Sequence, residues 1–555
     1  MRNITKLALF SLTSLMSVAE LQAVDAEQNG ATDASEQTTD NVEQVAPAER
    51  TPSSDEILDA KPTAQTTAFN IWEYRVTGNT LLSNGAIESA VYAFLGPEKS
   101  IDDIEKARVA LEQTYKAQGY PAVVVTIPEQ TVKKGIVYLE VVEGKIERVK
   151  ITGSKYHSLK AIRKRVPALT RGNVLYLPDV QAQLADLNQA SQNRSVVPVL
   201  RPGRAPGTVE VELRVNDVFP FHGNIEVNNQ HTADTTTTRA GVQIRYDNLF
   251  QKQHNLSLQY LTSPEDTDEV SVFAGTYILP ITYPADRLVM YGIQTDSNVT
   301  TIGDLTVLGD GQIVGIRYIK SLLSLENYYH SFSIGADYKN FEDSQAGTTF
   351  PISYWSGNVR YDGSMVSKKS LFQYNLSAIF GLPINAKRRE FLAKRSNSKT
   401  SFIYFTAGLS YKYNFDNGVE MHSRLDGQFA TSPLVNNEQF SFGGANSVRG
   451  YYESQVLNDT GFYGSVELVS PHLFKSTQDV NDFRLFAFYD VGMSDRLKSL
   501  PGEDNRVDLS STGIGLRAKV FNHWMAELDG AIALKENRTI KKDDVRWHAK
   551  LSYEF

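Results

Sequence analysis

The chain has 555 residues, a formal net charge of −8 and no cysteine. Its length fits roughly two to four domains. The missing cysteines exclude a disulfide framework, thiolate chemistry and cysteine-ligated zinc. The acidic balance and the absence of a long Lys/Arg run give no footprint for nucleic-acid binding.

Residues 1–26 have the pattern of an export signal. Two basic residues precede an apolar stretch over residues 7–18, and small residues at Ala23 and Ala26 offer cleavage points. A single transmembrane helix is the alternative, and it is disfavoured because the stretch is shorter than the ~20 residues of a helical span. No later apolar run is long enough either, so a membrane-embedded form of this chain has to be a β-barrel.

Residues 27–68 are predicted to be an acidic linker. Over residues 24–68 there is no aromatic residue, and ten acidic residues stand against two basic ones. Such a segment buries too little apolar surface to offset the entropy of ordering it. A short helix could begin near Ser53 or Ser54, where acidic residues follow in the first turn.

A repeated segment predicts two similar modules after the linker. The sequence Tyr-Arg-Val-Thr-Gly-Asn at residues 74–79 recurs 75 residues later as Val-Lys-Ile-Thr-Gly-Ser at residues 149–154. Each copy is followed by a helical pattern and then by alternating strands. We therefore predict two β-α-α-β-β modules, over residues 69–145 and 146–216.

The main helix of the first module has readable ends. Ser100 and Asp103 have the spacing of a capping box at its start. Gly119 suits its C-terminal stop, and Pro121 prevents continuation. Gly119-Tyr120-Pro121 could also contact a ligand directly, but a helix stop and turn is the favoured interpretation.

From residue 217 to residue 555 the period changes to a strict alternation of apolar and polar residues. A soluble β-sandwich also alternates, but the long strands, the charges on the second face and the aromatic strand ends favour a transmembrane barrel. At ~10 residues per strand the segment holds roughly fourteen to eighteen strands. The clearest alternating segments are residues 256–260, 372–380, 421–429, 524–534 and 547–555.

The last residues suggest how the barrel closes. Tyr553 and Phe555 are in register with the outward face of the final strand. This strand has to pair with the first one, near residues 223–227. Outer-membrane barrels typically present a terminal aromatic residue to their assembly machinery, so we expect Tyr553 and Phe555 to form that signal.

Two short segments have no obvious role in a passive barrel. Alternation over residues 483–491 places Asp490 opposite the lipid-facing side chains, and a carboxylate facing lipid is costly, so we expect it in the lumen. Arg449 lies among glycines that allow a sharply folded loop. An infolded Arg449 could form a bidentate, charge-assisted bond with Asp490; a surface arginine and a turn-end aspartate remain the simpler alternative.

These features together resemble a known family. The two modules are similar to POTRA domains, and the barrel, the Val-Arg-Gly-Tyr loop at 448–451 and the strand at 486–492 resemble TpsB transporters of two-partner secretion, within the BamA/TpsB superfamily. The resemblance covers residues 69 to 555. Further matches lie at residues 119–121, 127–130, 142–144 and 246–250.

The resemblance implies a mainly β fold, with a sixteen-stranded antiparallel transmembrane barrel preceded by two periplasmic α+β POTRA domains. It also implies a plug helix in the pore, which residues 27–68 do not clearly contain. The loop at 441–460 is expected inside the barrel, held there by a latch between Arg449 and Asp490. Phe486 and Phe488 are expected to pack the loop, Tyr451 to supply an aromatic contact, and Val448, Gly450 and Gly492 to surround the pair.

The resemblance also implies a function. The chain is expected in the outer membrane of a Gram-negative bacterium, where its POTRA domains recognise a large unfolded TpsA-type exoprotein, such as a toxin, adhesin, haemolysin or haem scavenger. Expected partners include outer-membrane lipid and lipopolysaccharide and the barrel-assembly machinery, with the chain a monomer. No cofactor, metal or enzymatic site is expected, since zinc-protease and nucleophile-elbow motifs are missing. A barrel-assembly insertase and a passive porin are the alternatives.

Overall fold

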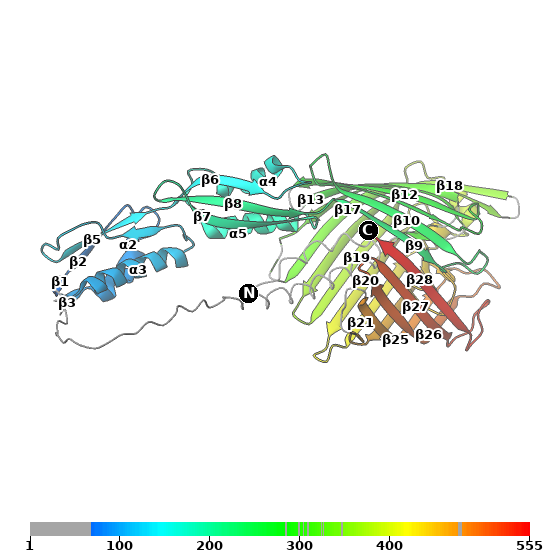
Figure 1. Ribbon diagram of the computed structural model, residues 1–555. Helices are drawn as coiled ribbons and strands as arrows, with labels where there is room; N and C mark the ends of the chain where they lie inside the picture. Colours follow the sequence, from blue (N-terminus) through cyan, green and yellow to red (C-terminus); the bar gives the residue numbers. More distant parts are fainter. Residues whose placement is uncertain are drawn as a thin grey trace. The chain divides into compact units, whose positions relative to one another are not determined.

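The computed structural model describes residues 68–282, 286–297, 300–302, 305–307, 310–323, 325, 327–345, 348–474 and 480–555. The described residues form two compact units that divide between Val218 and Phe219 (Figure 1). The predicted export signal and nearly all of the predicted linker, with its plug helix, lie outside the described residues. Among the described residues, no helix is both long enough and apolar enough to cross a lipid bilayer.

The first module of the smaller unit is a three-stranded sheet covered by two helices. Its main helix buries the predicted stripe, from Ile104 to Tyr115, against the sheet. The predicted capping box is confirmed, because the Ser100 backbone N–H donates to Asp103 at 2.9 Å. The sheet order is β2-β5-β4, and a small β1-β3 pair adjoins it. The elements are β1 (Phe69–Ile71), β2 (Glu73–Thr77), α2 (Asn84–Val91), η2 (Tyr92–Phe94), β3 (Gly96–Lys99), α3 (Ile101–Ala117), β4 (Val124–Thr126) and β5 (Ile136–Val142).

The second module repeats this plan with its own core. Its sheet order is β6-β8-β7, with β6 parallel to β8 and β7 antiparallel to it. The helices bury apolar residues such as Ile162, Val180 and Leu187 against the strands. The elements are β6 (Lys145–Thr152), α4 (Leu159–Arg165), η3 (Pro167–Leu169), α5 (Leu177–Gln189), β7 (Arg194–Pro202) and β8 (Thr208–Asp217).

Each module contains the same close backbone contact at its copy of the repeated segment. Gly78 and Gly153 both have a positive φ, at 78° and 85°. A Cβ at Gly78 would lie 2.2 Å from the Val141 carbonyl oxygen, and a Cβ at Gly153 would lie 2.2 Å from that of Val215. Only glycine fits both the backbone conformation and the space. The repeated sequence therefore requires glycine at this position for the same physical reason in each module.

The Gly119-Tyr120-Pro121 turn joins the two modules. The Gly119 carbonyl accepts a hydrogen bond from the Leu177 N–H at 2.8 Å. The rings of Tyr120 and Tyr176 have their centroids 5.1 Å apart. The turn therefore ends α3 and also seats the start of α5.

The larger unit is a closed antiparallel barrel of sixteen strands, so the strand number implied by the resemblance is confirmed (Figure 1). We call the rim at which the first strand begins the near rim, and the opposite one the far rim. The strands are β9 (Phe221–Asn228), β10 (Arg239–Leu249), β11 (His254–Thr262), β12 (Val270–Thr282), β13 (Asp286–Ser297), β16 (Asp310–Ser321), β17 (Tyr328–Gln345), β18 (Thr348–Val366), β19 (Ser370–Leu382), β20 (Ile403–Asn414), β21 (Glu420–Ala430), β24 (Thr460–Val469), β25 (Val480–Asp495), β26 (Arg506–Val520), β27 (Trp524–Ala533) and β28 (Val545–Glu554).

Several strands are longer than expected, among them β25 and β26 with 16 and 15 residues, and one hairpin exceeds the expectation most. β17 and β18 have 18 and 19 residues, well beyond the ~10 expected of a spanning strand. They pair continuously up to Gln345 and Thr348, next to the connection between them. The hairpin therefore continues past the length that a membrane requires.

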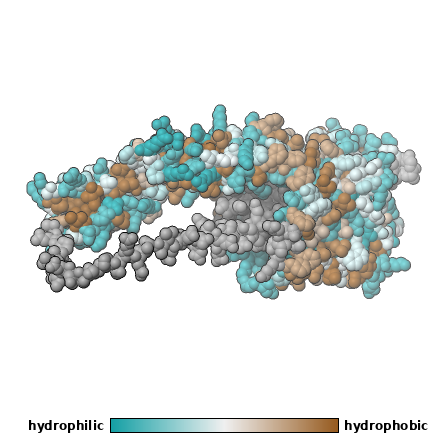
Figure 2. Space-filling view, in the orientation of Figure 1, coloured by the Kyte–Doolittle hydropathy of each residue, from teal (hydrophilic) through white to brown (hydrophobic). Residues whose placement is uncertain are grey.

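The barrel closes between its first and last strands. β28 pairs with β9 from Lys550–Asn228 to Glu554–Asn224. Phe555 continues the ladder, exchanging backbone hydrogen bonds of 2.9 and 3.0 Å with Gly223. The outer face carries exposed apolar side chains, and Figure 2 shows apolar residues spread over the outside of the strands.

A long connection at the far rim folds into the barrel. It joins β21 to β24 over residues 431–459, and we call it the pore loop. It contains η4 (Asn436–Glu438) and the hairpin of β22 (Phe440–Phe442) and β23 (Val456–Asn458). A neighbouring far-rim connection holds α6 (Arg388–Lys394), and a small β14 (Thr300–Ile302)–β15 (Leu305–Val307) pair lies in another.

Candidate functional site at the pore loop

The backbone of the pore loop turns sharply around Arg449. Gly443, Gly444 and Gly450 have positive φ values of 110°, 101° and 87°. The Gly443 N–H donates to the Ser447 hydroxyl at 2.8 Å, which closes the turn. The turn points Arg449 at the inner face of the barrel, where it is 4% exposed.

Arg449 and Asp490 form a two-pronged ion pair. The Arg449 Nε donates to Asp490 Oδ2 at 2.8 Å, and Nη2 donates to Oδ1 at 2.8 Å. The Arg449 backbone N–H adds a third bond to Oδ2 at 3.1 Å. Asp490 is fully buried on β25. The structure thus brings together the two residues that the sequence singled out, in the bidentate geometry that arginine favours.

Strand β24 supplies two further partners. Arg449 Nη1 donates to Glu467 Oε1 at 2.6 Å, and Nη2 donates to the Ser465 hydroxyl oxygen at 3.0 Å. The Ser465 hydroxyl in turn donates to Asp490 Oδ1 at 2.6 Å. Every terminal nitrogen of the guanidinium group is therefore bonded to the barrel wall.

The ion pair is part of a larger charge network on the inner wall. Arg517 on β26 donates to Glu467 at 2.9 Å and, through Nε, to Glu527 at 2.9 Å. Asp529 on β27 lies 3.8 Å from Arg449 Nη1. Its Oδ1 is buried and makes no hydrogen bond within the described part of the chain. Asp529 is thus a second buried carboxylate near Arg449, paired with it only through the longer 3.8 Å contact of Oδ2.

Two aromatic rings enclose the guanidinium group. Its carbon lies 3.5 Å from the ring centroid of Phe488 and 5.9 Å from that of Phe486. Arg517 lies over the other ring, 4.0 Å from the Phe486 centroid. A cation over an aromatic face is attracted by the ring quadrupole. Phe488 therefore packs mainly on Arg449 of the pore loop, and Phe486 packs mainly on Arg517 of the wall.

The remaining predicted residues lie around the pair. Gly450 donates its N–H to His548 Nε2 at 3.0 Å. The Tyr451 hydroxyl donates to the carbonyls of Lys535 and Ser510, at 2.7 and 3.0 Å, and its buried ring belongs to an apolar cluster with Phe442 and Val448. Val448 is fully buried, and a Cβ at Gly492 would lie 2.5 Å from the Phe442 ring.

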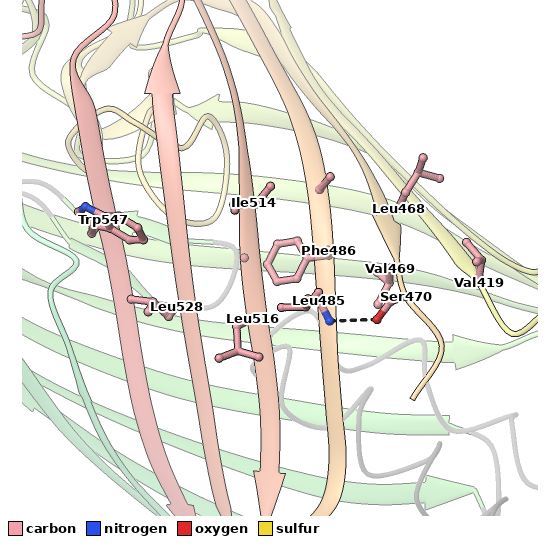
Figure 3. Close-up of a pocket in the computed structure, with 12 residues that line it drawn as sticks. Val419, Leu468, Val469, Ser470, Leu485, Phe486, Ile514, Leu516, Leu528 and Trp547 are labelled. Atoms are coloured by element: carbon pink, nitrogen blue, oxygen red, sulfur yellow. Dashed lines mark hydrogen bonds between the residues drawn. The ribbon is translucent and has the colours of Figure 1, made fainter. Parts of the chain in front are cut away.

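A groove of about 510 Å³ lies on the outside of the same wall, over β24 to β28. Figure 3 shows Leu485, Ile514, Leu528 and Trp547 around it. Leu485 and Ile514 are exposed and apolar, as expected of lipid-facing positions. Because side chains alternate along β25, Leu485 and Asp490 lie on opposite faces of the sheet. The groove therefore opens on the opposite face of the wall from Asp490, although Phe486 borders both the groove and the Arg449 site.

The arrangement suits holding a loop better than carrying out a reaction. It contains no activated nucleophile, and no group of three or more potential metal ligands occurs among the described residues. Removing one partner of a buried ion pair costs about 3–5 kcal/mol, since the other charge is left unpaired. Arg449 can therefore fix the loop strongly, and its release can change the pore.

Sequence reasoning did not identify the partners on β24, β26 and β27. Glu467 does carry a signal, because it lies between the apolar residues Val466 and Leu468 in an alternating strand. A carboxylate at such a position has to face the lumen. Ser465, Arg517 and Asp529 could not be assigned to the site without the register between strands.

The terminal aromatic residues lie at the near rim, far from the pore loop in the strand ladder. The Phe555 ring contacts Phe221 and Tyr553, with centroids 6.0 and 6.1 Å apart. A Cβ at Gly223 would lie 2.1 Å from the Phe555 ring, so the ring covers that glycine. Both residues thus sit on the closing seam.

Comparison with known proteins points to one family. The family described as haemolysin secretion/activation protein ShlB/FhaC/HecB matches residues 207–518, and the ShlB-type POTRA domain matches residues 69–144. The outer membrane transporter CdiB of Dickeya dadantii is 22% identical over 430 residues, covering 74% of each chain. The heme/hemopexin transporter protein HuxB of Haemophilus influenzae is 20% identical over 465 residues, covering 80% of each.

Solved structures share the fold. CdiB from Escherichia coli aligns with a TM-score of 0.60 at 18% identity, covering 97% of this chain and 99% of the other. BamA from Haemophilus ducreyi, lacking its POTRA domains 1–3, aligns with a TM-score of 0.54 at 13% identity, covering 88% and 100%. At these identities the likeness concerns the fold alone.

Proposed function

The chain belongs to the haemolysin secretion/activation protein family (ShlB/FhaC/HecB), and from this premise we propose how its two units move an exoprotein through the outer membrane. It is a TpsB-type transporter of the outer membrane of a Gram-negative bacterium, and it secretes a partner exoprotein. It is not an enzyme. The near rim, which follows the POTRA unit in the chain, faces the periplasm, and the far rim faces the cell exterior.

The pore loop acts as a latched element of the channel. The bidentate bond between Arg449 and Asp490 is the observation that carries this proposal, since it fixes the infolded loop to the inner wall. The latch holds the loop in a secretion-competent arrangement and has no catalytic role. Val448, Gly450, Tyr451, Phe486, Phe488 and Gly492 support it by packing and hydrogen bonding.

The POTRA unit captures the unfolded exoprotein by adding it as a strand to an open sheet edge. The main chain supplies the affinity in this mode, so varied sequences can be bound. The edge of β7 is poorly suited: the Asn188 side chain bonds both the N–H and the carbonyl of Val196, at 2.7 and 3.0 Å, and Pro198 has no N–H to donate. At the edge of β4, Arg108 donates to the Val125 carbonyl at 3.2 Å.

The edge of β6 is capped as well, because Ile146 bonds Gly172 and Asn173 through its backbone and Arg163 donates to the Val149 carbonyl at 3.0 Å. These capped edges leave β2 of the first module as the favoured docking strand. Within the described residues β2 pairs with β5 and with no other strand. A photo-crosslinking side chain at the exposed Arg75 on β2 should capture the exoprotein. The same group at Leu200 on β7 is the matched control and should capture much less.

The partner belongs to one of several classes. The relative HuxB, a heme/hemopexin transporter, favours a haem-scavenging protein, and a contact-dependent toxin, an adhesin or a haemolysin fits the same channel. No nucleotide is available outside the inner membrane, so folding of the exoprotein at the cell surface biases its movement outward. Tyr553 and Phe555 serve the barrel-assembly machinery during insertion, and outer-membrane lipid with lipopolysaccharide surrounds the barrel of a monomer.

Liposomes that contain only this protein test the proposed function. They should take up an unfolded N-terminal fragment of the partner exoprotein, and they should not take up an unrelated unfolded protein of similar length. Equal uptake of both proteins would favour a passive porin. Insertion of an unfolded barrel protein into the liposome membrane, without uptake of the fragment, would favour an insertase.

A further inference from the structure

We propose that Glu438 is a second, independent anchor of the pore loop, and that the tip of the loop swings on a stem which Glu438 holds in place. This inference rests on the proposed role of the loop in transport. Two parts of the loop are distinguished. The stem comprises residues 434–442 and 456–459, and the tip comprises residues 443–455 with Arg449.

Glu438 is held by three donors from the barrel wall. Its Oε1 accepts from Lys339 Nζ and from the Tyr354 hydroxyl, each at 2.6 Å. Its Oε2 accepts from the Tyr404 hydroxyl at 2.7 Å. Glu438 is 3% exposed, so a carboxylate taken from water is fully paired here. A buried charge with three bonds is costly to pull out, because its partners would be left without it.

The two anchors grip different parts of the wall. The donors to Glu438 lie on β17, β18 and β20, before the loop in the barrel order, whereas the partners of Arg449 lie on β24 and β25, after it. The two sets share no residue. Interactions without shared partners contribute nearly independently to stability. The pore loop is thus bonded both to strands that precede it in the barrel order and to strands that follow it.

Further bonds hold the stem in place without involving Arg449. Gln428 donates to the carbonyls of Glu438 and Asp459, at 3.0 and 3.1 Å. Asp459 accepts from the N–H groups of Leu434 and Leu497, each at 2.8 Å, and is fully buried. The stem therefore stays attached even if the bond between Arg449 and Asp490 breaks.

The junction between stem and tip has the backbone of a hinge. Gly443 and Gly444 follow β22 directly, and Ser454 stands shortly before β23 on the returning chain; all three have positive φ. The Ser454 N–H donates to the Gly443 carbonyl at 3.2 Å, which joins the two legs. Domain and loop motions concentrate at a few such positions. Loss of the Arg449 contact thus loosens the tip about this junction, against the remaining bonds of Gly450 to His548 and of Tyr451 to Ser510 and Lys535.

Amide hydrogen exchange in the full-length protein, embedded in lipid nanodiscs without exoprotein, tests the inference. Arg449→Ala should speed exchange about ten-fold or more in peptides from 443–455 and leave 434–442 protected. Glu438→Gln should speed exchange in peptides from 434–442 and leave those from 443–455 protected. Tyr404→Phe, which removes a single donor to Glu438, should raise exchange of the stem to a smaller extent. Glu269→Gln, at a far-rim carboxylate bonded to Thr236, is the control and should change neither segment.

Two results would overturn the inference. One is equal loss of protection in stem and tip for Arg449→Ala, because the loop would then open as a single unit. The other is unchanged protection of the stem in both Glu438→Gln and Tyr404→Phe. The measurement needs no transport. If the variants show the predicted exchange pattern but the wild-type protein does not import the exoprotein, the proposed function is contradicted and the second anchor still holds.

Discussion

Phe488 on β25 and Gly513 on β26 lie directly opposite each other, and the ring occupies the space that a side chain at Gly513 would need. A Cβ at Gly513 would lie 2.5 Å from the Phe488 ring and 2.1 Å from the Gly530 carbonyl oxygen. The same ring supports the guanidinium of Arg449 from 3.5 Å. A glycine in the wall thus makes room for the aromatic support of the loop.

Gly513→Ala should therefore weaken the site. The added methyl group has to displace the Phe488 ring or push the neighbouring strands apart, which costs about 1–3 kcal/mol. The folded barrel should unfold at a lower temperature on gel-shift assay, and export should fall. Gly292→Ala is the control, because its Cβ would meet nothing closer than 4.0 Å. Equal effects of both substitutions would show that the Phe488 contact is unimportant.

Arg449→Lys should fail to replace arginine. An ammonium group cannot make the two parallel bonds to Asp490 and also reach Ser465 and Glu467. We expect normal amounts of assembled barrel with export of the partner reduced about ten-fold, close to that of Arg449→Ala. Export by Arg449→Lys at the wild-type rate would mean that a positive charge alone suffices.

Much of the fold could be predicted because its periods are local. Strict alternation identifies barrel strands, and the capping box at Ser100 identifies the start of α3. The length of β17 and β18 could not be predicted, since nothing in their alternation marks where the membrane ends. The family resemblance, and not spacing, supplied the strand number.

The candidate site divides in the same way. Alternation assigns Asp490 to the lumen and glycines permit an infolded Arg449, but neither fixes which strands face each other. Ser465 and Asp529 depend on the register of β24 and β27, which barrel closure sets. Glu438 carries no local signal, because its partners lie on strands that are distant in sequence. The pairing of strands distant in sequence therefore determines which further residues join the site, and local sequence patterns do not reveal it.

Glu467→Gln should remove the charge that links the two arginines of the site, Arg449 and Arg517. Glu467 accepts from Arg449 at 2.6 Å and from Arg517 at 2.9 Å, so its charge is shared between them. Loss of that charge should lower the free energy of unfolding of the barrel by about 1–3 kcal/mol. It should also raise the fraction of time for which the channel is open in planar-bilayer recordings. Ser465→Ala removes one neutral partner and should have a smaller effect. A larger effect of Ser465→Ala would contradict this ranking.

The second POTRA module should lose stability in acid. Burial opposes the charge of Asp217, but the N–H groups of Lys155 and Tyr156, each at 2.9 Å, outweigh it and hold its pKa below the usual 3.8. Burial also lowers the pKa of His157 below its usual 6.5, in spite of its bond to Asp217. The folded module therefore binds fewer protons than the unfolded one, and its stability falls as pH falls.

The acid effect should appear in two steps. The His157 contribution is complete above pH 6.5 and is lost below it; the Asp217 contribution is complete above pH 3.8 and is lost as the pH drops further. A dye on a single engineered cysteine at Lys160, in a chain without native cysteines, can follow urea unfolding of this module. Asp217→Asn should remove the lower step. A midpoint that rises on acidification would contradict the assignment.

The most direct test of the latch compares two buried carboxylates near Arg449. Asp490 makes three bonds to Arg449, whereas Asp529 makes none and lies 3.8 Å away. Export of the partner should be measured at matched amounts of folded barrel. Asp490→Asn should reduce it about ten-fold or more, since the buried arginine loses its paired charge, and Asp529→Asn should leave it nearly unchanged. Equal losses in both variants, or normal export by Asp490→Asn, would contradict the latch.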